Sequence, residues 1–491
     1  MRCSRRTPDD GAPEVILAID QGTTGTTCLV VNEQMQPTGR GYCRIRQYFP
    51  NPGWVEHDPE EIWASVVAAS EAALAAAHVT PAELSAIGIA NQRETTLVWE
   101  RRTGRPLQRA IVWQDRRTAE RCRELPAELI RERTGVLPDP YFSATKLEWI
   151  LARTAASPND LAFGTVDSWL VWKLTGGRVH VTDVTNASRT MLLDLRTRDW
   201  DDELLALFHV DRAMLPRVVA SCGIVGEAEL LGTTLPITGI AGDQQAALFG
   251  QACFLPGQSK VTYGTGSFVL VNVGEAKGPA PAGLLKTAAA VGPDAGPQYA
   301  VEGAVLASGA AVQWLRDGLG LISSAAETEQ LAQQVDSSEG VYFVPALTGL
   351  GSPYWDPEVR GLISGITRGT TRAHLARATL EAIAFQVADV LDALPGFVEI
   401  LRVDGGATVN RFLMQFQADL VGCPVEVAAE AETTALGAAA LAGLAVGLWS
   451  GLEAVEQRIR VGARYEPTMS REDVARRREE WQLALRRALL R

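Results

Sequence analysis

The stretch VILAIDQGTTGTTCLVVN, residues 15–32, decides the fold. Its apolar run ends in Asp20 and predicts a buried strand. The segment Gly22–Thr27 is rich in glycine and threonine and predicts a turn, after which residues 28–32 resume a strand. The sequence therefore predicts a strand, a tight turn and a second strand that returns beside the first.

The same pattern recurs at residues 260–273, where the turn is Gly264–Ser267. Two occurrences far apart predict two similar α/β halves with a break near residues 250–258, where Gly250, Pro256 and Gly257 lie. The remaining patterns predict helices at 62–77, 148–155, 161–174, 307–319, 372–394, 435–448 and 471–491, and strands at 85–90, 96–99 and 400–404.

Composition narrows the class of protein. The 491 residues are 46% hydrophobic and 21% charged, as in globular rather than disordered chains. The net charge of −12 argues against nucleic acid or an anionic membrane as a partner, because both require a basic surface. Seven scattered cysteines without a CxxC pair indicate reduced thiols and a cytoplasmic protein.

Two segments could be mistaken for targeting or membrane signals. Residues 1–14 are polar, lack the apolar core of a secretory signal, and are predicted to be a disordered tail. Residues 433–452 carry no charge, but alanine, glycine and threonine dominate them, so a closely packed buried helix is expected there and no membrane insertion. The final helix could lie on a membrane surface, but docking on its own domain is the favoured interpretation.

Several common catalytic motifs are missing, including a Walker A loop, a GxGxxG turn after a strand and HExxH. What remains is a set of glycine and threonine turns joined to acidic residues. Backbone N–H groups and threonine hydroxyls of such a turn can donate to phosphate oxygens, and Asp20 at the strand end can hold the accompanying Mg²⁺. An ordinary hairpin would have the same sequence, so the turn at 22–25 is not decisive alone.

Further candidates lie elsewhere in the chain. The turn Asp404–Ala407 follows a strand, and its glycine pair could let a flat base approach the backbone. Asp243 either caps the helix that follows it or accepts a proton from a substrate hydroxyl. The polar segment 91–95 is either a hairpin tip or a polyol clamp, in which Arg93 donates and Glu94 accepts hydrogen bonds.

Taken together, these residues resemble the glycerol kinases of the FGGY carbohydrate kinase family. The resemblance runs from about Val15 to about Tyr465 and includes the following stretches: DQGTT (20–24), GWVEHDP (53–59), NQRETT (91–96), IVWQ (111–114), DPYFS (139–143), VTDVTNASRTM (181–191), GDQQAALFG (242–250), 263–268, GLGSPYWDP (349–357) and 402–407. It implies two ribonuclease-H-like domains of the actin-like ATPase type around a central cleft, at residues 15–254 for glycerol and phosphate and 255–491 for the adenine nucleotide.

The resemblance also implies an activity, ATP-dependent phosphorylation of glycerol to sn-glycerol 3-phosphate, the first step of glycerol catabolism. Asp243 would be the general base, and Asp20 and Asp243 would hold Mg²⁺. Glycerol would contact Arg93, Glu94, Trp113, Tyr141, Asp243, Gln244 and Phe268, with the tryptophan and phenylalanine as an apolar wall. ATP would contact Thr23, Thr24, Gly25, Thr27, Thr265, Gly309, Gln313, Gly406 and Asn410.

This sequence also departs from the family pattern. Several bacterial members carry an arginine where Thr27 lies, so a phosphate contact is weaker here or comes from elsewhere. Leu231–Pro236 contains no arginine, so inhibition by fructose bisphosphate is not expected, and no histidine lies between His209 and His374 to be phosphorylated. A homodimer or homotetramer is expected.

Three alternatives stay open at this point. Another FGGY kinase would act on a different sugar or polyol. An actin-like or chaperone-like ATPase would hydrolyse ATP without regard to glycerol, and a glycerol-sensing relative would bind without turnover. The pair Arg93 and Glu94, with Trp113 and Phe268, favours glycerol over the first alternative.

Overall fold

The computed structural model describes residues 15–276, 278–394, 396 and 398–490, so the predicted tail at 1–14 lies outside the described residues. The chain forms two compact units. Among described residues, the first unit contains 15–252, 287–297 and 434–459, and the second contains 253–286, 298–433 and 460–490. The sequence predicted a single division between residues 254 and 255. The two units differ from that prediction because residues 287–297 and 434–459 belong to the first unit.

Hydrogen bonds and close packing join these two segments to the first unit. Thr287 Oγ1 is bonded to Ser188 Oγ at 2.7 Å and accepts from Gln245 Nε2 at 2.9 Å. Helix α13 (Thr433–Val446) approaches strand β5 (Leu84–Asn91) so closely that a Cβ on Gly88 would lie 2.2 Å from the Ala438 carbonyl oxygen. The apolar stretch 433–452 is thus largely a packed helix, as its composition predicted.

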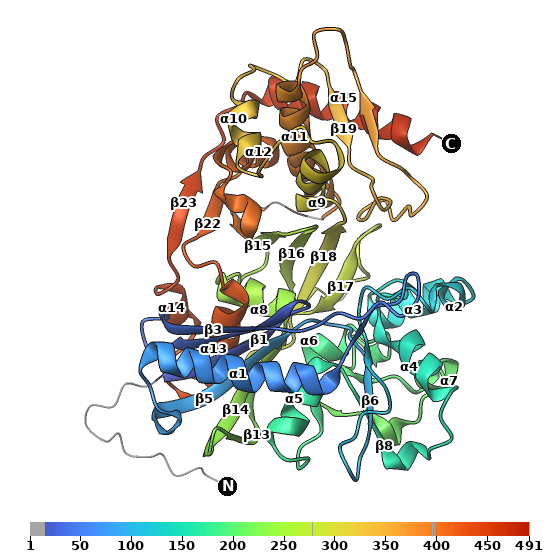
Figure 1. Cartoon of the computed structure of the whole chain (residues 1–491), viewed down its shortest axis with the longest axis vertical. Helices are drawn as coiled ribbons and strands as arrows, with labels where there is room; N and C mark the ends of the chain where they lie inside the picture. Colours follow the sequence, from blue (N-terminus) through green and yellow to red (C-terminus); the bar gives the residue numbers. More distant parts are fainter. Residues whose placement is uncertain (1–14, 277, 395, 397, 491) are drawn as a thin grey trace. The chain divides into compact units, whose positions relative to one another are not determined.

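The first unit is built on a six-stranded sheet. The sheet order is β13 (Cys222–Leu230), β14 (Thr233–Gly242), β5, β1 (Val15–Gln21), β2 (Gly25–Val31) and β3 (Pro37–Arg44). Its strands β13, β14, β5, β1 and β3 are labelled in Figure 1. Strands β14, β5 and β1 are parallel to one another. Strand β2 is antiparallel to β1, and β3 is antiparallel to β2. The predicted strand–turn–strand unit is therefore confirmed at the centre of this sheet.

Helix α1 (Pro59–Ala77) covers one face of β2 and β3. Asp58 caps it by accepting from the Glu60 N–H, and Pro59 occupies its first turn. The contact requires glycine on β3, because a Cβ on Gly41 would lie 2.0 Å from the Ala69 carbonyl oxygen. The opposite face of β1 and β2 carries Asp20 and Thr27, which are directly paired.

The second unit repeats this topology on a seven-stranded sheet, whose edge strand β17 (Leu285–Ala288) ends in two residues, 287 and 288, that group with the first unit. The sheet order is β17, β18 (Tyr299–Val305), β16 (Ser267–Gly274), β15 (Ser259–Tyr263), β21 (Leu401–Asp404), β22 (Val425–Ala428) and β23 (Val461–Tyr465). Strands β15, β21 and β22 are parallel, and β16 and β18 are antiparallel to their neighbours. The series β18-β16-β15-β21-β22 therefore matches β3-β2-β1-β5-β14 of the first unit.

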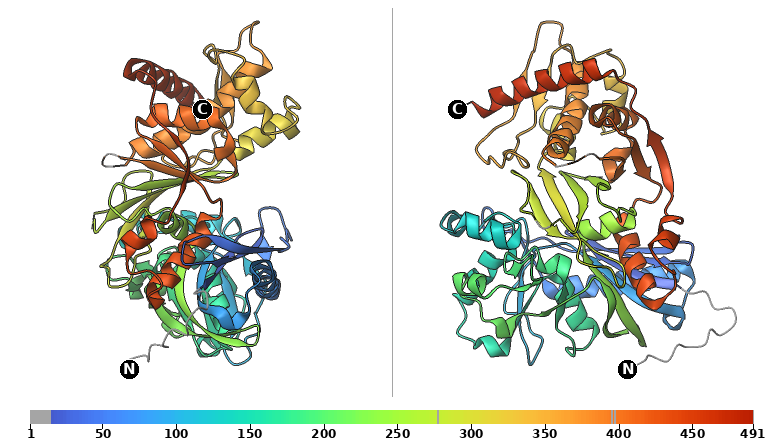
Figure 2. Two further views of the ribbon diagram at one scale, coloured as in Figure 1. Left: turned by 90° about the vertical axis from the view of Figure 1, so that its left-hand side faces the viewer. Right: turned by 180° about the vertical axis from the view of Figure 1, so that it is seen from behind.

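Three helices of the second unit pack around one aromatic centre: α11 (Arg372–Asp392), α12 (Arg411–Val421) and α15 (Arg471–Leu489). Trp481 of α15 stacks on Phe385 of α11 with ring centroids 5.1 Å apart, and its Nε1 donates to Asp389 Oδ2 at 2.7 Å. The last helix thus docks on its own unit, as favoured from the sequence, and Figure 2 shows it beside α11.

Several predicted boundaries were wrong. The turn expected at 22–27 is shorter, because β2 already begins at Gly25. The helix expected at 148–155 is α4 (Ser143–Leu151), and the one expected at 161–174 is strand β8 (Leu161–Gly164) followed by α5 (Val166–Leu174). The helix expected at 307–319 divides into α9 (Gly309–Gln313) and a π-helical turn, η4 (Trp314–Gly318). Short apolar runs do not distinguish strand from helix by periodicity, which explains the error at β8.

Shorter elements complete the two units. They are β4 (Glu56–His57), β6 (Leu97–Glu100), β7 (Ala110–Ile111), α2 (Ala119–Arg123), α3 (Ala127–Thr134), β9 (Val181–Asp183), α6 (Val184–Ala187), β10 (Leu193–Asp194), β11 (Asp199–Trp200), α7 (Asp202–Leu207), β12 (Arg217–Val219), α8 (Asp243–Gly250), α10 (Glu327–Ala332), β19 (Tyr342–Val344), β20 (Leu362–Ser364), α14 (Leu452–Glu456) and the 3₁₀ turns η1 (Pro81–Glu83), η2 (Pro158–Asp160), η3 (Arg212–Met214) and η5 (Gly406–Val409).

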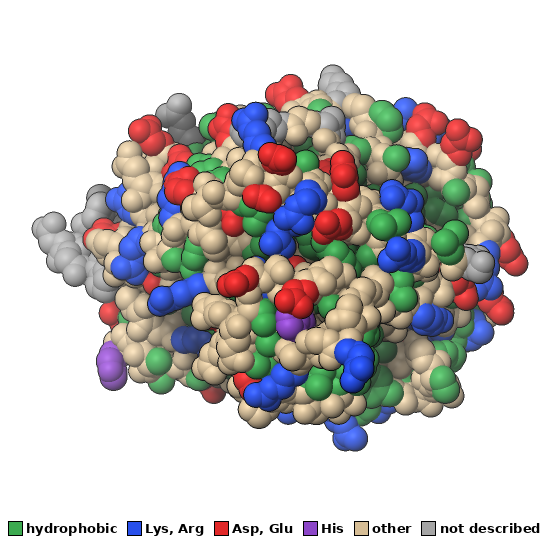
Figure 3. All heavy atoms as spheres, turned by 90° about the horizontal axis from the view of Figure 1, so that it is seen from above, with side chains coloured by type: hydrophobic (Ala, Val, Ile, Leu, Met, Phe, Trp, Pro, Cys, Tyr) green, Lys and Arg blue, Asp and Glu red, His purple; other side chains and the backbone are tan. Residues whose placement is uncertain are grey.

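The charged side chains of the surface and the state of the cysteines fit the expectations drawn from the composition. Acidic and basic side chains are interspersed over the face drawn in Figure 3. The six cysteines among the described residues are free, and all but Cys43 are buried. Within the described part of the chain, no helix has both the length and the apolar character needed to span a bilayer.

Candidate active site

The candidate residues of the first unit follow the carboxyl ends of three adjacent parallel strands. Gln21 of β1 is paired with Asn91 of β5, which is paired in turn with Gly242 of β14. The segments that follow these positions are the turn 22–24, the polar segment 92–95 and the start of α8. Ligands of open α/β sheets bind at such strand ends, so the topology alone brings these three segments to one edge.

Hydrogen bonds within the glycine and threonine turn, and one from the residue that follows β3, fix the turn. The Gly22 N–H donates to the Gly25 carbonyl at 2.9 Å, and the Ile45 N–H donates to the Thr24 carbonyl at 3.1 Å. Thr23 is half-buried and Thr24 is exposed, so the tip is open to a ligand. Thr27 lies apart from the tip, buried on β2 opposite a half-buried Asp20.

A hollow of about 430 Å³ adjoins this turn. Its lining combines the turn, the end of β3 and the following loop: Thr24, Arg44, Ile45, Arg46, Gln47 and Phe49. Arg44 is exposed and is paired across the ladder with Gly25. The β3 end therefore adds positive charge beside the turn, at a site that the sequence did not single out.

The segment 92–95 is buried rather than a hairpin tip. Arg93 is only 2% exposed, and its Nε lies 3.2 Å from Asp243 Oδ1 and 3.8 Å from Glu94 Oε1. Glu94 is 1% exposed, and its Oε1 accepts from Arg189 Nε at 2.5 Å. The structure thus brings Arg93, Glu94 and Asp243 together, with Arg189 as a second buried cation.

Asp243 does not cap its helix. The N-cap of α8 is Gly242, and Asp243 is the first helical residue, with its side chain 29% exposed. The Gln244 N–H donates to Asp243 Oδ1 at 2.7 Å, and Gln244 is half-buried. The capping interpretation of Asp243 is therefore wrong, and its carboxylate is accessible beside Arg93. Gly242 leaves no room for a side chain, because a Cβ there would lie 2.7 Å from Arg93 Cγ.

Two aromatic side chains lie beside this group. The rings of Trp113 and Tyr141 make an edge-to-face contact with centroids 5.5 Å apart. The Trp113 Nε1 donates to Thr23 Oγ1 at 2.9 Å, which connects the aromatic pair to the turn. The Arg189 guanidinium lies 5.3 Å from the centroid of the Tyr141 ring, so one arginine contacts both Glu94 and Tyr141.

In the second unit, the turn 264–266 contacts the start of α9. The N–H groups of Ser308 and Ala310 donate to the Thr265 carbonyl at 3.0 and 2.9 Å, and the Gly309 N–H donates to the Gly264 carbonyl at 3.0 Å. This close approach needs glycine, because a Cβ on Gly309 would lie 2.6 Å from the Gly264 carbonyl oxygen. Thr265 and Gly309 therefore lie together, with Gln313 exposed on the same short helix.

The remaining expected residues of the second unit lie on other elements. Gly405 has φ +95°, and a Cβ there would lie 2.4 Å from the Tyr263 carbonyl oxygen, while Gly406 is exposed with open space beside it. Asn410 is the N-cap of α12 and accepts from the Leu413 N–H at 2.9 Å. Phe268 is half-buried on β16.

Comparison with known proteins identifies the family. The model of the FGGY family of carbohydrate kinases, N-terminal domain, matches residues 15–250, and the model of the C-terminal domain matches residues 259–446. The chain belongs to the FGGY family of carbohydrate kinases. Its two-unit architecture is the actin-like, ribonuclease-H-like fold of these kinases, as the sequence predicted.

Individual members of this family are similar over almost their whole length. Glycerol kinase 2 of Thermotoga maritima is 53% identical over 489 residues, which cover 96% of this chain and 98% of that protein. Glycerol kinase of Geobacillus kaustophilus is 50% identical over 97% of this chain and 99% of its own. The crystal structure of Plasmodium falciparum glycerol kinase with ADP superposes with a TM-score of 0.92 at 35% identity, covering 99% and 100% of the two chains.

Two buried cations in this FGGY kinase were not predicted from the sequence as site residues. Arg189 pairs with Glu94, although the two lie 95 positions apart. Lys146 of α4 donates to the main-chain carbonyls of Tyr141 at 2.6 Å and Glu94 at 3.5 Å. Arg189 lies within a stretch that carried the resemblance, and no comparably clear local signal marked Lys146 in the polar first turns of α4.

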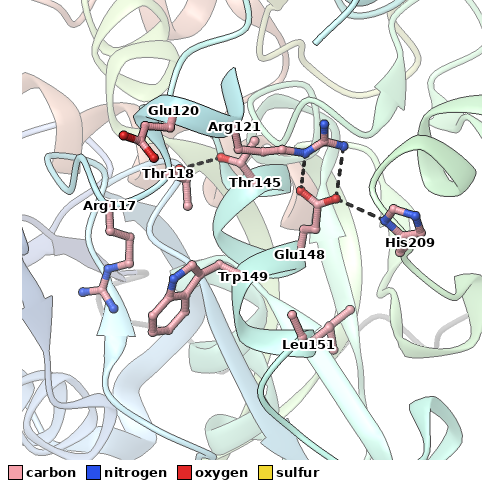
Figure 4. A pocket seen from close by; sticks show the side chains of 10 residues that line it. Arg117, Thr118, Glu120, Arg121, Thr145, Glu148, Trp149, Leu151 and His209 are labelled. Carbon is pink, nitrogen blue, oxygen red and sulfur yellow. Dashed lines mark hydrogen bonds and ion pairs between the residues drawn. The ribbon is translucent and has the colours of Figure 1, made fainter. Parts of the chain in front are cut away.

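Helix α4 has a second, outer face. Thr145, Glu148 and Trp149 line a hollow of about 570 Å³, drawn in Figure 4. Glu148 accepts from Arg121 Nε at 2.9 Å and contacts His209 Nδ1 at 3.1 Å. Arg121, Glu148 and His209 therefore pair with one another in this hollow, whereas Arg117 pairs with Glu56 and Asp115, which are not among its lining residues.

Proposed function

We propose that this protein is an ATP-dependent kinase that transfers the γ-phosphoryl group of ATP to glycerol and forms sn-glycerol 3-phosphate. The observation that carries the proposal is the cluster of Arg93, Glu94 and Asp243 at the strand ends, beside Trp113 and Tyr141. Two glycerol kinases are 53% and 50% identical to this chain over nearly its full length, and this similarity supports the same reaction.

The cluster suits a small triol. Arg93 donates and Glu94 accepts hydrogen bonds, and Tyr141 and Gln244 add further polar groups at its edge. The ring of Trp113 offers an apolar surface for the carbon atoms, and Phe268 of the second unit is proposed to add to it. An analogue that lacks a hydroxyl would leave one of these buried polar groups unpaired, which is the basis of selectivity.

Asp243 is proposed as the general base. Its carboxylate is partly exposed and lies next to Arg93, so it can accept the proton of the attacking hydroxyl as the phosphoryl group arrives. Arg93 fixes the position of this carboxylate through the 3.2 Å contact. Such proton transfer contributes roughly 10²–10⁴ in rate, and alignment of the hydroxyl with the γ-phosphate contributes much of the rest.

The turn at 22–25 is proposed to hold the phosphates of ATP through its N–H groups and the hydroxyls of Thr23 and Thr24. Thr27 is a weaker candidate than the turn residues because it is buried on β2. In the second unit, the nucleotide contacts are proposed at Thr265, Gly309, Gln313, Gly406 and Asn410. Asn410 would contribute mainly by fixing the start of α12, because its side-chain oxygen already accepts from Leu413.

The residues present fit Mg²⁺ that arrives with the nucleotide. Asp20 is a half-buried carboxylate at the end of β1, and Asp243 is a partly exposed one after β14. Mg²⁺ binds through one or two carboxylates together with substrate phosphates and water, so Asp20 and Asp243 would hold it. When bound, the ion neutralises the charge that develops on the phosphates.

The cellular setting follows from the same proposal. We infer that the enzyme is cytoplasmic, starts glycerol catabolism and forms a homodimer or homotetramer. Sedimentation velocity on the purified protein measures its oligomeric state directly.

The test is release of ADP from Mg·ATP with glycerol, xylulose, ribulose, gluconate and erythritol supplied in turn. Strong stimulation by glycerol alone supports the proposal. Stimulation by another polyol would keep the fold and the base but overturn the assignment of Arg93, Trp113 and Phe268. A rate that ignores every polyol would point to an ATPase.

A further inference from the structure

Lys146 is a fully buried cation that the proposed reaction does not use. Its side chain has 0% exposure on α4, in the face that also buries Leu147 and Ile150. Burying an ammonium group is costly unless strong hydrogen-bond partners surround it. The groups that Lys146 contacts therefore indicate which part of the structure the buried ammonium group stabilises.

These partners are main-chain carbonyls of two site segments. Lys146 Nζ donates to the Tyr141 carbonyl at 2.6 Å and to the Glu94 carbonyl at 3.5 Å. The Glu94 carbonyl also accepts from Ser143 Oγ at 3.0 Å, and Ser143 begins the same helix. One helix start thus holds the backbone of both segments, although they lie far apart in the sequence.

The backbone at Glu94 needs such support. Its φ is +61°, in the left-handed region that non-glycine residues adopt at a cost. The side chain of Glu94 is fixed separately by Arg189, whose Nε lies 2.5 Å from its Oε1. Arg189 therefore orients the carboxylate, while Lys146 and Ser143 fix the peptide that carries it.

We propose that Lys146 is a positioning residue for the polyol site, whose ammonium group holds the backbone of Glu94 and Tyr141 in the arrangement that binds glycerol. The inference rests on the proposed function, because it concerns the same polyol. Lys146 contacts neither substrate nor reacting atoms. Its loss should therefore weaken glycerol binding and leave binding of Mg·ATP nearly unchanged.

Charged groups from several elements face Lys146. They are Glu94 and its partners Arg93 and Arg189, Asp115 with its partner Arg117, Asp139 with its partner Arg116, and the thiol of Cys122 on α2. Burial lowers the pKa of Lys146 to about 8, although the three carboxylates oppose that shift. Burial raises the pKa of the Cys122 thiol to about 11, so its titration lies well above that of the lysine.

The sign of the pH effect follows from these groups. Below the pKa of Lys146 the ammonium group is charged and its bonds to the two carbonyls are charge-assisted. Above that pKa a neutral amine makes weaker bonds, so the KM for glycerol should rise about three- to tenfold between about pH 7 and about pH 9.5. The KM for Mg·ATP should stay within about twofold over the same range, because the hydrogen bonds described for Lys146 go to the Glu94 and Tyr141 carbonyls and not to the turn at 22–25.

The first experiment measures both KM values across this pH range in the unaltered protein and in Tyr141→Phe. The variant removes the phenol as a titrating group but keeps the Tyr141 carbonyl, so the rise in glycerol KM should persist. A glycerol KM that is flat with pH, or a rise that disappears in Tyr141→Phe, would overturn the inference. Absence of any glycerol-dependent ADP release would instead overturn the proposed function.

The second experiment uses substitutions. Lys146→Met, if folded by circular dichroism, should raise the glycerol KM at least about tenfold and abolish its pH dependence. Should that variant not fold, Ser143→Ala removes the neighbouring donor and should raise the glycerol KM about two- to threefold with kcat little changed. Lys173→Met is the matched control, because Lys173 pairs with Glu60 at the surface of the same unit. An unchanged glycerol KM in both folded variants would contradict the inference.

Discussion

The indole Nε1 of Trp113 donates to Thr23 Oγ1 at 2.9 Å, so the aromatic wall proposed for glycerol is joined to the turn proposed for the phosphates. The wall and the turn come from segments 90 residues apart in the sequence. A change in the aromatic wall should therefore also affect ATP, and a change in the turn should also affect glycerol.

Trp113→Phe and Thr23→Val test this connection. Each variant should lower kcat/KM for glycerol by up to about tenfold, because a single hydrogen bond contributes about 0.5–1.5 kcal/mol. The double variant should be no worse than the poorer single one, since both remove the same bond. Steady-state kinetics on the unaltered protein, the two single variants and the double variant would measure this coupling. Additive losses of kcat/KM would show that the hydrogen bond does not contribute to function.

Asp243→Asn should still bind metal-free ADP and lose nearly all turnover. The amide keeps the shape of the side chain but cannot accept the hydroxyl proton, so kcat should fall by about 10²–10⁴. Single-turnover kinetics and ADP titration by calorimetry would separate the two effects. A kcat close to that of the unaltered protein would remove Asp243 from the role of base.

Glu94→Gln should mainly raise the KM for glycerol. The substitution removes the buried charge that Arg93 and Arg189 both contact and replaces one of the two acceptor oxygens by an NH2 donor, so the clamp is weakened and the protein also becomes less stable. The expected rise is at least about tenfold, with the KM for Mg·ATP unchanged. Thermal unfolding should show a lower midpoint, and an unaltered glycerol KM in the folded variant would show that the clamp is misassigned.

Gly242→Ala should damage the site through Arg93. A Cβ at this position would lie 2.7 Å from both Arg93 Cγ and Cδ, so the arginine must shift away from Asp243. We expect a fall in kcat/KM of at least about tenfold. Gly278→Ala is the control, because open space surrounds that exposed glycine. Equal activity of the two variants would contradict the account.

The sequence predicted those parts of the fold whose signals are local. Strands β1 and β15 were recognised because apolar runs end abruptly at glycine and threonine turns. Helix α4 was placed five residues too late, because its first turns contain Ser143, Thr145 and Lys146, which hide the apolar stripe. The return of residues 287–297 to the first unit depends on long-range contacts such as Ser188 with Thr287, which no local pattern indicates.

The candidate site divides in the same way. Arg93, Glu94 and Asp243 were identified because polar residues follow apolar strands there and because the family resemblance includes them, and the structure brings them together. Arg189 and Lys146 were missed because their partners lie 95 and up to 52 positions away. Local chemistry therefore indicated the groups that are proposed to face the polyol, whereas the groups proposed to hold them in place required the fold.

The most direct test of the central claim is phosphorus NMR of the unaltered protein with Mg·ATP and glycerol. The account predicts that a phosphomonoester, sn-glycerol 3-phosphate, grows in equal amount to ADP while inorganic phosphate stays low. Inorganic phosphate that grows in equal amount to ADP, with or without glycerol, would show that water is the acceptor and would contradict the account.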